Sequence, residues 1–352
     1  MTLQRIDELC RHVVPEKELA AEARLPLKQK RGVERAQGEF VSKVLADPVE
    51  GRRLCHAMLL PREDSRPHLE KFQQHGRVDL PGASLERRGK AAVLTLRNPA
   101  VLNAEDETTL PGTEIAVDVA LLDPRTEVCV LRGGTVEHPK YRGRRLFGAG
   151  INLTHLYDGK IRYLWYLIRD LGFVNKIYRG LAKPDADPEV DSIEKLWIGA
   201  VEGFAIGGHC QLLLALDYTL AAADAYLTLP ARKEGIIPGA ANLRLPRLVG
   251  DRLARQAILA ERRIECASPE GLLICDQIVA AGEMDAAIDE IVQRLTSSGV
   301  VSAAGNRRAF RIVQEPLDAF RRYMSVYARE QAHCHLSPAL VANLEKNWRQ
   351  AA

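Results

Sequence analysis

The sequence lacks several features that would place the chain in a specialised class of protein. No stretch approaches the roughly 20 uninterrupted apolar residues that a membrane-spanning helix needs, and residues 1–20 are charged throughout, without the apolar core of a secretory signal. The seven cysteines show no paired spacing, which argues against a disulfide framework. We therefore expect a cytoplasmic protein with no membrane association and with reduced, mostly buried thiols.

The chain also lacks a strong charge of either sign and a recognisable metal-binding motif. Its 49 basic and 46 acidic side chains leave a formal net charge of +3. This near balance argues against a general nucleic-acid-binding protein, which needs a concentrated basic face. The run His333-Cys334-His335 has no second ligand cluster at a suitable spacing, so we expect no metal site.

Short apolar runs alternate with helical patterns along the middle of the chain, which predicts an α/β fold. A strand, a helix and a second strand in this order form a βαβ unit, which implies a parallel sheet with right-handed crossovers. The expected strands span residues 91–96, 127–131, 198–201 and 218–222, and the expected helices between them span residues 105–122 and 207–216.

The chain divides into three sections that differ in their pattern of apolar and polar residues. Residues 1–82 are helical in pattern and carry no chemical signal, residues 83–280 contain the strand and helix alternation, and residues 281–352 are helical again. Within the middle section, Ser268-Pro269-Glu270 is typical of the cap and first turn of a helix. We expect a helical N-terminal extension, a core of alternating strands and helices, and a C-terminal helical region.

Two glycine-bearing segments carry the main chemical signal. The first is FGAGINL at residues 147–153, and the second is IGGHCQ at residues 206–211. Gly208 lies at the start of an expected apolar helix, where N–H groups are unpaired and the helix dipole favours negative charge. A glycine there lets a ligand oxygen approach the backbone closely.

Residues 197–216 (WIGAVEGFAIGGHCQLLLAL) and the Pro-Gly-Ala turn at 238–240 resemble the central motif of the crotonase (enoyl-CoA hydratase/isomerase) superfamily. The resemblance implies a crotonase fold of repeated ββα units with residues 83–280 as the crotonase core, and an acyl-CoA substrate. It implies a homotrimer or homohexamer in which residues 281–352 serve oligomerisation. It also implies an oxyanion hole made by the backbone N–H groups of Ile151 and Gly208. Two such donors aimed at an enolate oxygen each contribute about 3 kcal/mol to transition-state stabilisation. Their neighbours in the two segments are expected to border the substrate: Ala149, Gly150, Asn152, Gly207 and His209.

Two carboxylates of the hydratases are missing from this chain. Gln211 stands where they carry a glutamate three residues after the second glycine, and Ala231 stands where they carry one seven residues before the Pro-Gly-Ala turn. An enzyme that adds water across a double bond needs an acid and a base at these places. Hydration is therefore not the expected reaction.

The same departures, together with Asn152, the run His209-Cys210-Gln211 and residues 144–161, resemble one branch of the superfamily, the (3,5-dihydroxyphenyl)acetyl-CoA 1,2-dioxygenases. This resemblance implies an oxidoreductase without metal or organic cofactor. It would convert the arylacetyl-CoA and O2 to 3,5-dihydroxyphenylglyoxylate and free CoA, for dihydroxyphenylglycine and glycopeptide antibiotic biosynthesis.

Neutral side chains suit that reaction, because a carboxylate would hydrate and charge the space that O2 must occupy. Gln211 can donate a neutral hydrogen bond to a peroxide, and Ala231 leaves apolar room. We expect Ile236 and Ile237 to line the same oxygen pocket.

The hydroxyl groups of the ring need polar partners, since buried unpaired groups are costly. Glu105 and Arg169 are the candidates, although Glu105 fits equally well as a glutamate favoured by the dipole at a helix N-terminus. His209 invites a role as a base, but its position just inside the helix favours a packed or hydrogen-bonded structural histidine.

The CoA site has a weaker signal. We expect the backbone at Val101 and Asn103, with Lys140 and Arg144 or Arg145, to contact the nucleotide and its phosphates. These basic residues fit equally well as the solvated face of a loop.

Two other functions fit the same motifs. One is a different crotonase-type reaction of an acyl-CoA, namely thioester hydrolysis, decarboxylation or isomerisation with Glu105 as the base. The other is a non-catalytic acyl-CoA-binding homologue that has lost its glutamates, against which the two intact glycine segments count.

Overall fold

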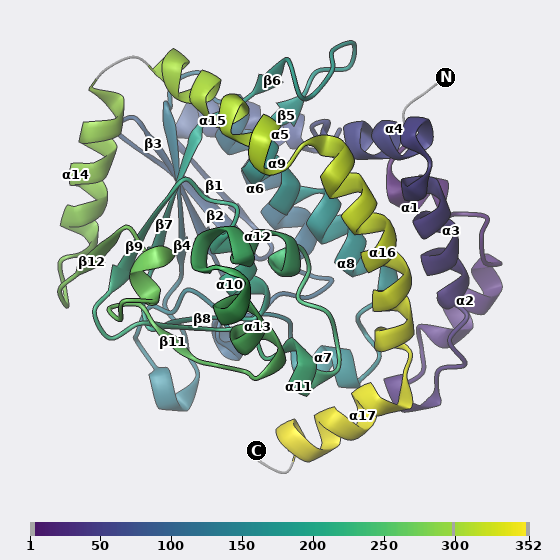
Figure 1. The fold of residues 1–352 in the computed structure, drawn as a ribbon. Coiled ribbons are helices and arrows are strands. Elements are labelled where there is room, and N and C mark those ends of the chain that lie inside the picture. Colours follow the sequence, from purple (N-terminus) through teal and green to yellow (C-terminus); the bar gives the residue numbers. More distant parts are fainter. Residues whose placement is uncertain (1–3, 298–299, 350–352) are drawn as a thin grey trace.

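A seven-stranded sheet forms the centre of the molecule in the computed structural model, which describes residues 4–297 and 300–349 (Figure 1). The first three strands pair with one another in antiparallel fashion, and every pairing from the third strand onward is parallel. In spatial order the strands are β1 (Arg77–Leu80), β2 (Ala83–Arg88), β3 (Ala91–Leu96), β4 (Val128–Gly133), β7 (Leu196–Val201), β9 (Tyr218–Ala222) and β12 (Gln277–Val279).

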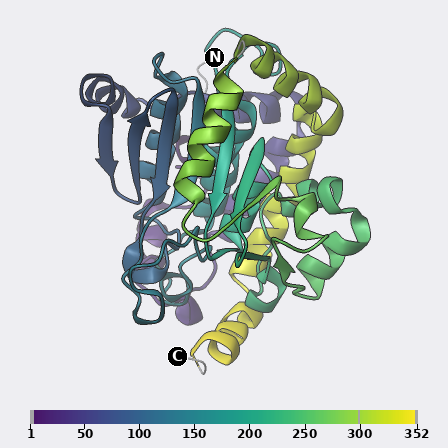
Figure 2. The ribbon, with the colours of Figure 1, turned by 90° about the vertical axis from the view of Figure 1, so that its left-hand side faces the viewer.

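Helices cover both faces of this sheet. Helix α14 (Met284–Thr296) packs on one face, in front of the strands in Figure 2, and α6 (Leu110–Leu122) packs on the other. Every residue of β4 is consequently buried. Strands covered on both faces are mostly apolar rather than alternating. This explains why β3 (AAVLTL) and β4 (VCVLRG) are apolar on both sides of the chain, except at Thr95 and Arg132.

A smaller sheet next to the main one completes a repeated unit. Its strands are β8 (Phe204–Ile206), β10 (Tyr226–Thr228) and β11 (Ile264–Glu265), with β10 between the other two. The chain runs from β7 through β8 into helix α10 (Gly208–Leu213), and then from β9 through β10 into α11 (Ala231–Glu234). These two ββα units confirm the fold expected from the glycine motif, and they bring α10 and α11 to the same end of the main sheet.

The N-terminal and C-terminal sections pack against each other. Helix α16 lies along α3 in Figure 1, although the two are nearly 300 residues apart in the sequence. No helix within residues 4–297 and 300–349 is long and apolar enough to cross a membrane. The N-terminal helices are α1 (Ile6–Leu9), α2 (Glu16–Glu22), α3 (Arg35–Ala46), α4 (Pro48–Leu59) and α5 (Ser65–His75), and the C-terminal helices after α14 are α15 (Val300–Gln314), α16 (Leu317–His335) and α17 (Pro338–Leu344).

The remaining elements lie between these sections. A short hairpin is formed by β5 (Leu181–Ala182) and β6 (Ser192–Ile193). The remaining helices are α7 (Leu153–Tyr157), α8 (Tyr163–Leu171), α9 (Phe173–Arg179), α12 (Ala241–Val249) and α13 (Asp251–Leu259).

The structure differs from the expected elements in three places. The helix expected from residue 105 begins only at Leu110, because Glu105 is held in a bridge with Ile151 in which its N–H donates to Gly150 O over 2.7 Å. The helix expected after Ser268 is a single 3-10 turn, Gly271–Leu273. Residues 77–80 form β1 rather than a helix, since the turn through Gly82 returns the chain as β2.

Candidate active site

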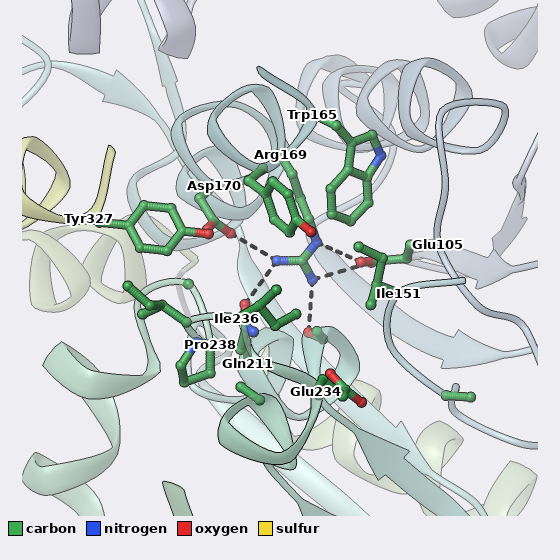
Figure 3. Close-up of a pocket in the computed structure, with 17 residues that line it drawn as sticks. Glu105, Ile151, Trp165, Arg169, Asp170, Gln211, Glu234, Ile236, Pro238 and Tyr327 are labelled. Carbon is green, nitrogen blue, oxygen red and sulfur yellow. Dashed lines mark hydrogen bonds and ion pairs between the residues drawn. The ribbon is translucent and has the colours of Figure 1, made fainter. Parts of the chain in front are cut away.

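A small cavity lies where α8, α10 and the segment from α11 to Gly239 meet (Figure 3). Helix α16 contributes Tyr327 to the same cavity. Of the residues named from the sequence, ten line it: Glu105, Ala149, Ile151, Arg169, Gly207, Gly208, Gln211, Ala231, Ile236 and Ile237.

Two backbone amides are exposed to this cavity. Gly148 pairs with Ala205 in an isolated bridge, which brings the two glycine segments together. A Cβ atom built on Gly150 would lie 3.1 Å from Gly208 N, so the two chains pass too closely for any larger residue. Among the described residues, the N–H groups of Ile151 and Gly208 donate to no acceptor. Such a pair of unpaired donors at a cavity wall is suited to binding an oxyanion.

Arg169 of α8 lies behind this wall and is hydrogen-bonded through all of its N–H groups. Its Nε donates to Glu105 Oε2 over 2.5 Å and its Nη2 to Glu105 Oε1 over 3.3 Å. The other bonds run from Nη1 to Asp170 Oδ1 (2.9 Å) and Gln211 Oε1 (3.1 Å), and from Nη2 to Gly208 O (2.8 Å). A guanidinium has five N–H donors, so an aryl hydroxyl can bind Arg169 only by displacing one of these partners.

This network joins one cation, Arg169, to two carboxylates, those of Glu105 and Asp170. Burial opposes the charge on Arg169, but the attraction of Glu105 and Asp170 outweighs it and raises the pKa of Arg169. Burial raises the pKa of Asp170, and Arg169 partly offsets this effect. A Cβ atom on Gly208 would lie 3.0 Å from Glu105 Oε2 and would therefore press on the ion pair. The sequence named Glu105 and Arg169 separately, and the structure joins them beside the two amides.

Gln211 presents one end of its side chain to this network and the other to the cavity. Because Arg169 can only donate, the bonded oxygen is fixed as Oε1, and the amide NH2 of Gln211 donates to no acceptor among the described residues. Ala231, Ile236 and Ile237 give the adjoining wall an apolar surface. The cavity thus holds a free neutral donor beside apolar space.

His209 lies outside the cavity lining. Its ring is fully buried, its Nδ1 accepts a hydrogen bond from Gly150 N over 2.9 Å, and it packs edge-on against Phe147. Burial lowers the pKa of His209 to about 4, so the ring is neutral at physiological pH. Its contacts hold the first glycine segment against α10.

Gly150 and Asn152 also stand outside the lining. The Asn152 side chain accepts a hydrogen bond from His155 N at the start of α7 and donates to Asp106 Oδ2 over 2.9 Å. Both residues set the path of the chain on either side of Ile151.

None of the five residues named for CoA, Arg145 included, lines the cavity. The Asn103 side chain is buried and donates to the carbonyl oxygens of Gly134 and Leu146, each over 2.9 Å. Lys140 is exposed beside the Tyr141 ring, and Arg144 pairs with Asp224 at the surface. Val101 lies in the turn before Asn103. A CoA site at these residues stays a prediction.

Sequence reasoning missed seven lining residues. Asp170 has a signal, since it follows Arg169 directly, and Trp165 lies one helical turn before Arg169 on the same face of α8. Glu234 lies one turn after Ala231 on α11, and its carboxylate pairs with no donor or cation among the described residues. The missed residues are Trp165, Tyr166, Asp170, Glu234 and Tyr327, together with Pro238 and Gly239, which were named from the sequence only as part of a turn and not as site residues.

The described parts of the chain contain no cluster of side chains suited to binding a metal ion. Within residues 4–297 and 300–349, no group of three or more His, Cys, Asp or Glu side chains is placed to hold an ion.

Comparison with known proteins gives a consistent set of relatives. The family model for enoyl-CoA hydratase/isomerase matches residues 86–316. A curated relative from Amycolatopsis orientalis, (3,5-dihydroxyphenyl)acetyl-CoA 1,2-dioxygenase, is 46% identical over 337 residues, which cover 93% of this chain and 77% of the relative. A short-chain-enoyl-CoA hydratase from Clostridium acetobutylicum is 27% identical over 66% of this chain and 82% of that protein. The crystal structure of an enoyl-CoA hydratase from Mycobacterium avium subsp. paratuberculosis matches with a TM-score of 0.63 at 20% identity, over 77% of this chain and 97% of that one.

Proposed function

The chain belongs to the enoyl-CoA hydratase/isomerase (crotonase) family, and we propose that within this family it is a (3,5-dihydroxyphenyl)acetyl-CoA 1,2-dioxygenase. The observation that carries this proposal is its 46% identity, over 93% of its length, to a dioxygenase of that name. The reaction takes the arylacetyl-CoA and O2 to 3,5-dihydroxyphenylglyoxylate, free CoA and one proton. Both atoms of O2 enter the acid.

The first step forms an enolate of the thioester. The carbonyl oxygen gains negative charge and is held by the N–H groups of Ile151 and Gly208, which are the unpaired amides of the cavity wall. A donor of this kind is worth about 3 kcal/mol in the transition state. Arg169, through its bond to Gly208 O, fixes the peptide that follows one of the two amides.

The aryl ring lies against the polar part of the cavity. Glu105 accepts a hydrogen bond from a ring hydroxyl, since the carboxylate has acceptor capacity beyond its two bonds to Arg169. The electron-rich ring and the thioester together stabilise the carbanion. Arg169 holds Glu105 in place and serves as a positioning residue for the ring.

Oxygen reacts on the apolar side of the same cavity. The enolate passes an electron to O2 in the space beside Ala231, Ile236 and Ile237, and recombination forms a peroxide at Cα. The free NH2 of Gln211 donates a hydrogen bond to this peroxide. The peroxide then attacks the thioester carbonyl, CoA leaves as a thiolate, and cleavage of the O–O bond with loss of the second Cα proton gives the α-keto acid.

The same proposal extends to the cofactors, the CoA contacts, the assembly and the cellular role of the enzyme. No metal or organic cofactor takes part, because the enolate itself reduces O2. The CoA moiety contacts the backbone at Val101 and Asn103 and the side chains of Lys140 and Arg144. We expect a cytoplasmic homotrimer or homohexamer that supplies dihydroxyphenylglycine for glycopeptide antibiotic biosynthesis.

The test is anaerobic mixing of the chelator-treated protein with (3,5-dihydroxyphenyl)acetyl-CoA, followed by admission of 18O2. We expect no product before oxygen enters, and afterwards an α-keto acid that carries two 18O atoms, measured by mass spectrometry. Release of CoA without oxygen consumption would identify a thioester hydrolase instead. Tight binding of the thioester without turnover would identify a non-catalytic homologue.

A further inference from the structure

Glu234 contributes a carboxylate to the cavity that has no bonding partner among the described residues. It forms the last residue of α11, and both Ala231 and Glu234 line the cavity, as residues three apart on one helical face do. Figure 3 shows Glu234 on the side of the cavity away from Trp165. The other two cavity carboxylates, Glu105 and Asp170, are both bonded to Arg169, whereas the carboxylate of Glu234 makes no hydrogen bond or ion pair with a described residue.

The surroundings of Glu234 favour its protonated form without blocking its ionisation. Burial, and then repulsion by Glu261, raise the pKa of Glu234 to about 7, while the exposed Lys233 acts in the opposite direction. Such a group is carboxylate and carboxylic acid in similar amounts at neutral pH, which is the state in which a general base and its conjugate acid work best.

Among the described residues, no cation from a neighbouring helix pairs with Glu234. Glu261, just beyond α13, is paired with Arg232 over 3.1 Å. From α8, Tyr166 presents a phenol that shares a hydrogen bond with His335 of α16. Burial raises the pKa of this phenol well above its ordinary value and lowers the pKa of His335 to about 3, so both are neutral when Glu234 titrates. From α17 the contacts with this segment are apolar or amide groups, such as Leu340 and Asn343 beside Gly235.

We propose that Glu234 is the base that removes the first proton from Cα of the arylacetyl thioester. The inference rests on the proposed function and names a group that it leaves open. The proton passes from Cα to a carboxylate oxygen of Glu234, the electron pair of the C–H bond enters the enolate, and the charge on the thioester oxygen is met by Ile151 N and Gly208 N. Glu234 later returns the proton to the sulfur of the departing CoA thiolate, and the second Cα proton leaves to solvent.

The position of Glu234 solves a spatial problem of the dioxygenase reaction. Hydratases of the family carry a glutamate at the position of Ala231, where this enzyme needs apolar room for O2. A carboxylate one helical turn farther along α11 keeps an acid–base group in the cavity and leaves the wall at Ala231, Ile236 and Ile237 uncharged. Proton removal and oxygen capture therefore use different parts of one wall.

The test measures proton removal separately from oxygen chemistry. Substrate is mixed with the full-length protein in D2O without oxygen, and exchange of the Cα hydrogens is followed by NMR. We expect exchange with the wild-type protein and a loss of about 10²–10⁴-fold in both exchange and aerobic turnover for Glu234→Gln, the range of a general base. The affinity for substrate should stay within about threefold, because Gln keeps the shape of the side chain. Glu234→Asp retains a carboxylate and should recover part of the exchange, which a purely structural role would not produce.

Glu261→Gln is the matched control, because it removes a nearby carboxylate outside the cavity lining. It should leave exchange at high pH unchanged and shift the acid limb of the pH profile to lower pH, since Glu261 raises the pKa of Glu234. Exchange by Glu234→Gln within about threefold of wild type would overturn the proposal, as would oxygen consumption by a wild-type protein that exchanges no Cα hydrogen. Wild-type exchange that is lost in Glu234→Gln, without oxygen consumption, would support Glu234 as the base and refute the dioxygenase function, so the two failures are distinct.

Discussion

Glu234→Gln should make the free energy of unfolding less sensitive to pH. Glu234 has a pKa of about 7 in the folded protein against an ordinary value of 4.5. Between these values the folded state binds this proton more tightly than the unfolded state does, so folding stability falls as the pH rises through the window. Gln cannot ionise, so the variant does not lose this stability as the pH rises.

The size of the effect follows from the same pKa. Each unit is worth about 1.4 kcal/mol, so ionisation of Glu234 removes about 3 kcal/mol of stability between pH 4 and pH 8. The variant should equal the wild type near pH 4 and exceed it by up to about 3 kcal/mol at pH 8. Urea unfolding, followed by circular dichroism at several pH values and fixed protein concentration, measures the difference.

The pH dependence of the stability difference between Glu234→Gln and the wild type is a sharper test than its size. A curve that rises from pH 4.5 to 7 and then levels is expected, and Glu261→Gln should give a smaller rise of the same sign. A difference that stays constant with pH would mean that Glu234 titrates normally in the folded protein, and the physical basis for its role as a base would be lost.

Three further predictions concern the network around Arg169. Arg169→Met leaves two buried carboxylates without their cation and should lower the free energy of unfolding, measured in urea, by about 3–5 kcal/mol. Glu105→Gln leaves Arg169 paired with Asp170 and should lower it by about 1.5 kcal/mol. Equal losses of stability in the two variants would refute the assigned pairing. Gly208→Ala puts a Cβ atom 3.0 Å from Glu105 Oε2 and should lower kcat/KM about tenfold through displacement of the ion pair, and an unchanged value would contradict this geometry. Gln211→Glu charges the oxygen side of the cavity and removes the free NH2 donor, so oxygen uptake should fall about 100-fold; undiminished uptake would exclude the peroxide contact.

The sheet was predictable because its signal is local. Strands such as β3 and β4 are buried on both faces, and the apolar runs that this burial requires stand out in the sequence. The start of α6 was not predictable in the same way. Residues after Glu105 have helical composition, but Glu105 bonds to Gly150 and Asn152, which lie about 45 residues away, and this pairing overrides the local preference.

The site residues also fall into those that a local motif predicts and those that depend on long-range packing. The two glycine segments and the substitutions at Gln211 and Ala231 could be read from short motifs, and these residues line one cavity in the structure. The pairing of Glu105 with Arg169 links positions 64 residues apart, and Tyr327 reaches the cavity from α16. No local pattern reports contacts of this kind, because they depend on how the helices pack.

The division of charge in the cavity explains how one site can both move a proton and admit oxygen. Arg169 has no N–H group left to bind or orient the peroxide, because carboxylates, an amide and a carbonyl occupy all five. His209 is neutral and outside the lining, so it does not provide the base. Glu234 remains as the cavity group that titrates near neutral pH. Anaerobic Cα exchange should therefore rise with pH along a single ionisation near 7 and level above it, because the carboxylate form is the base; a profile that falls over this range would require a protonated catalyst and would exclude Glu234.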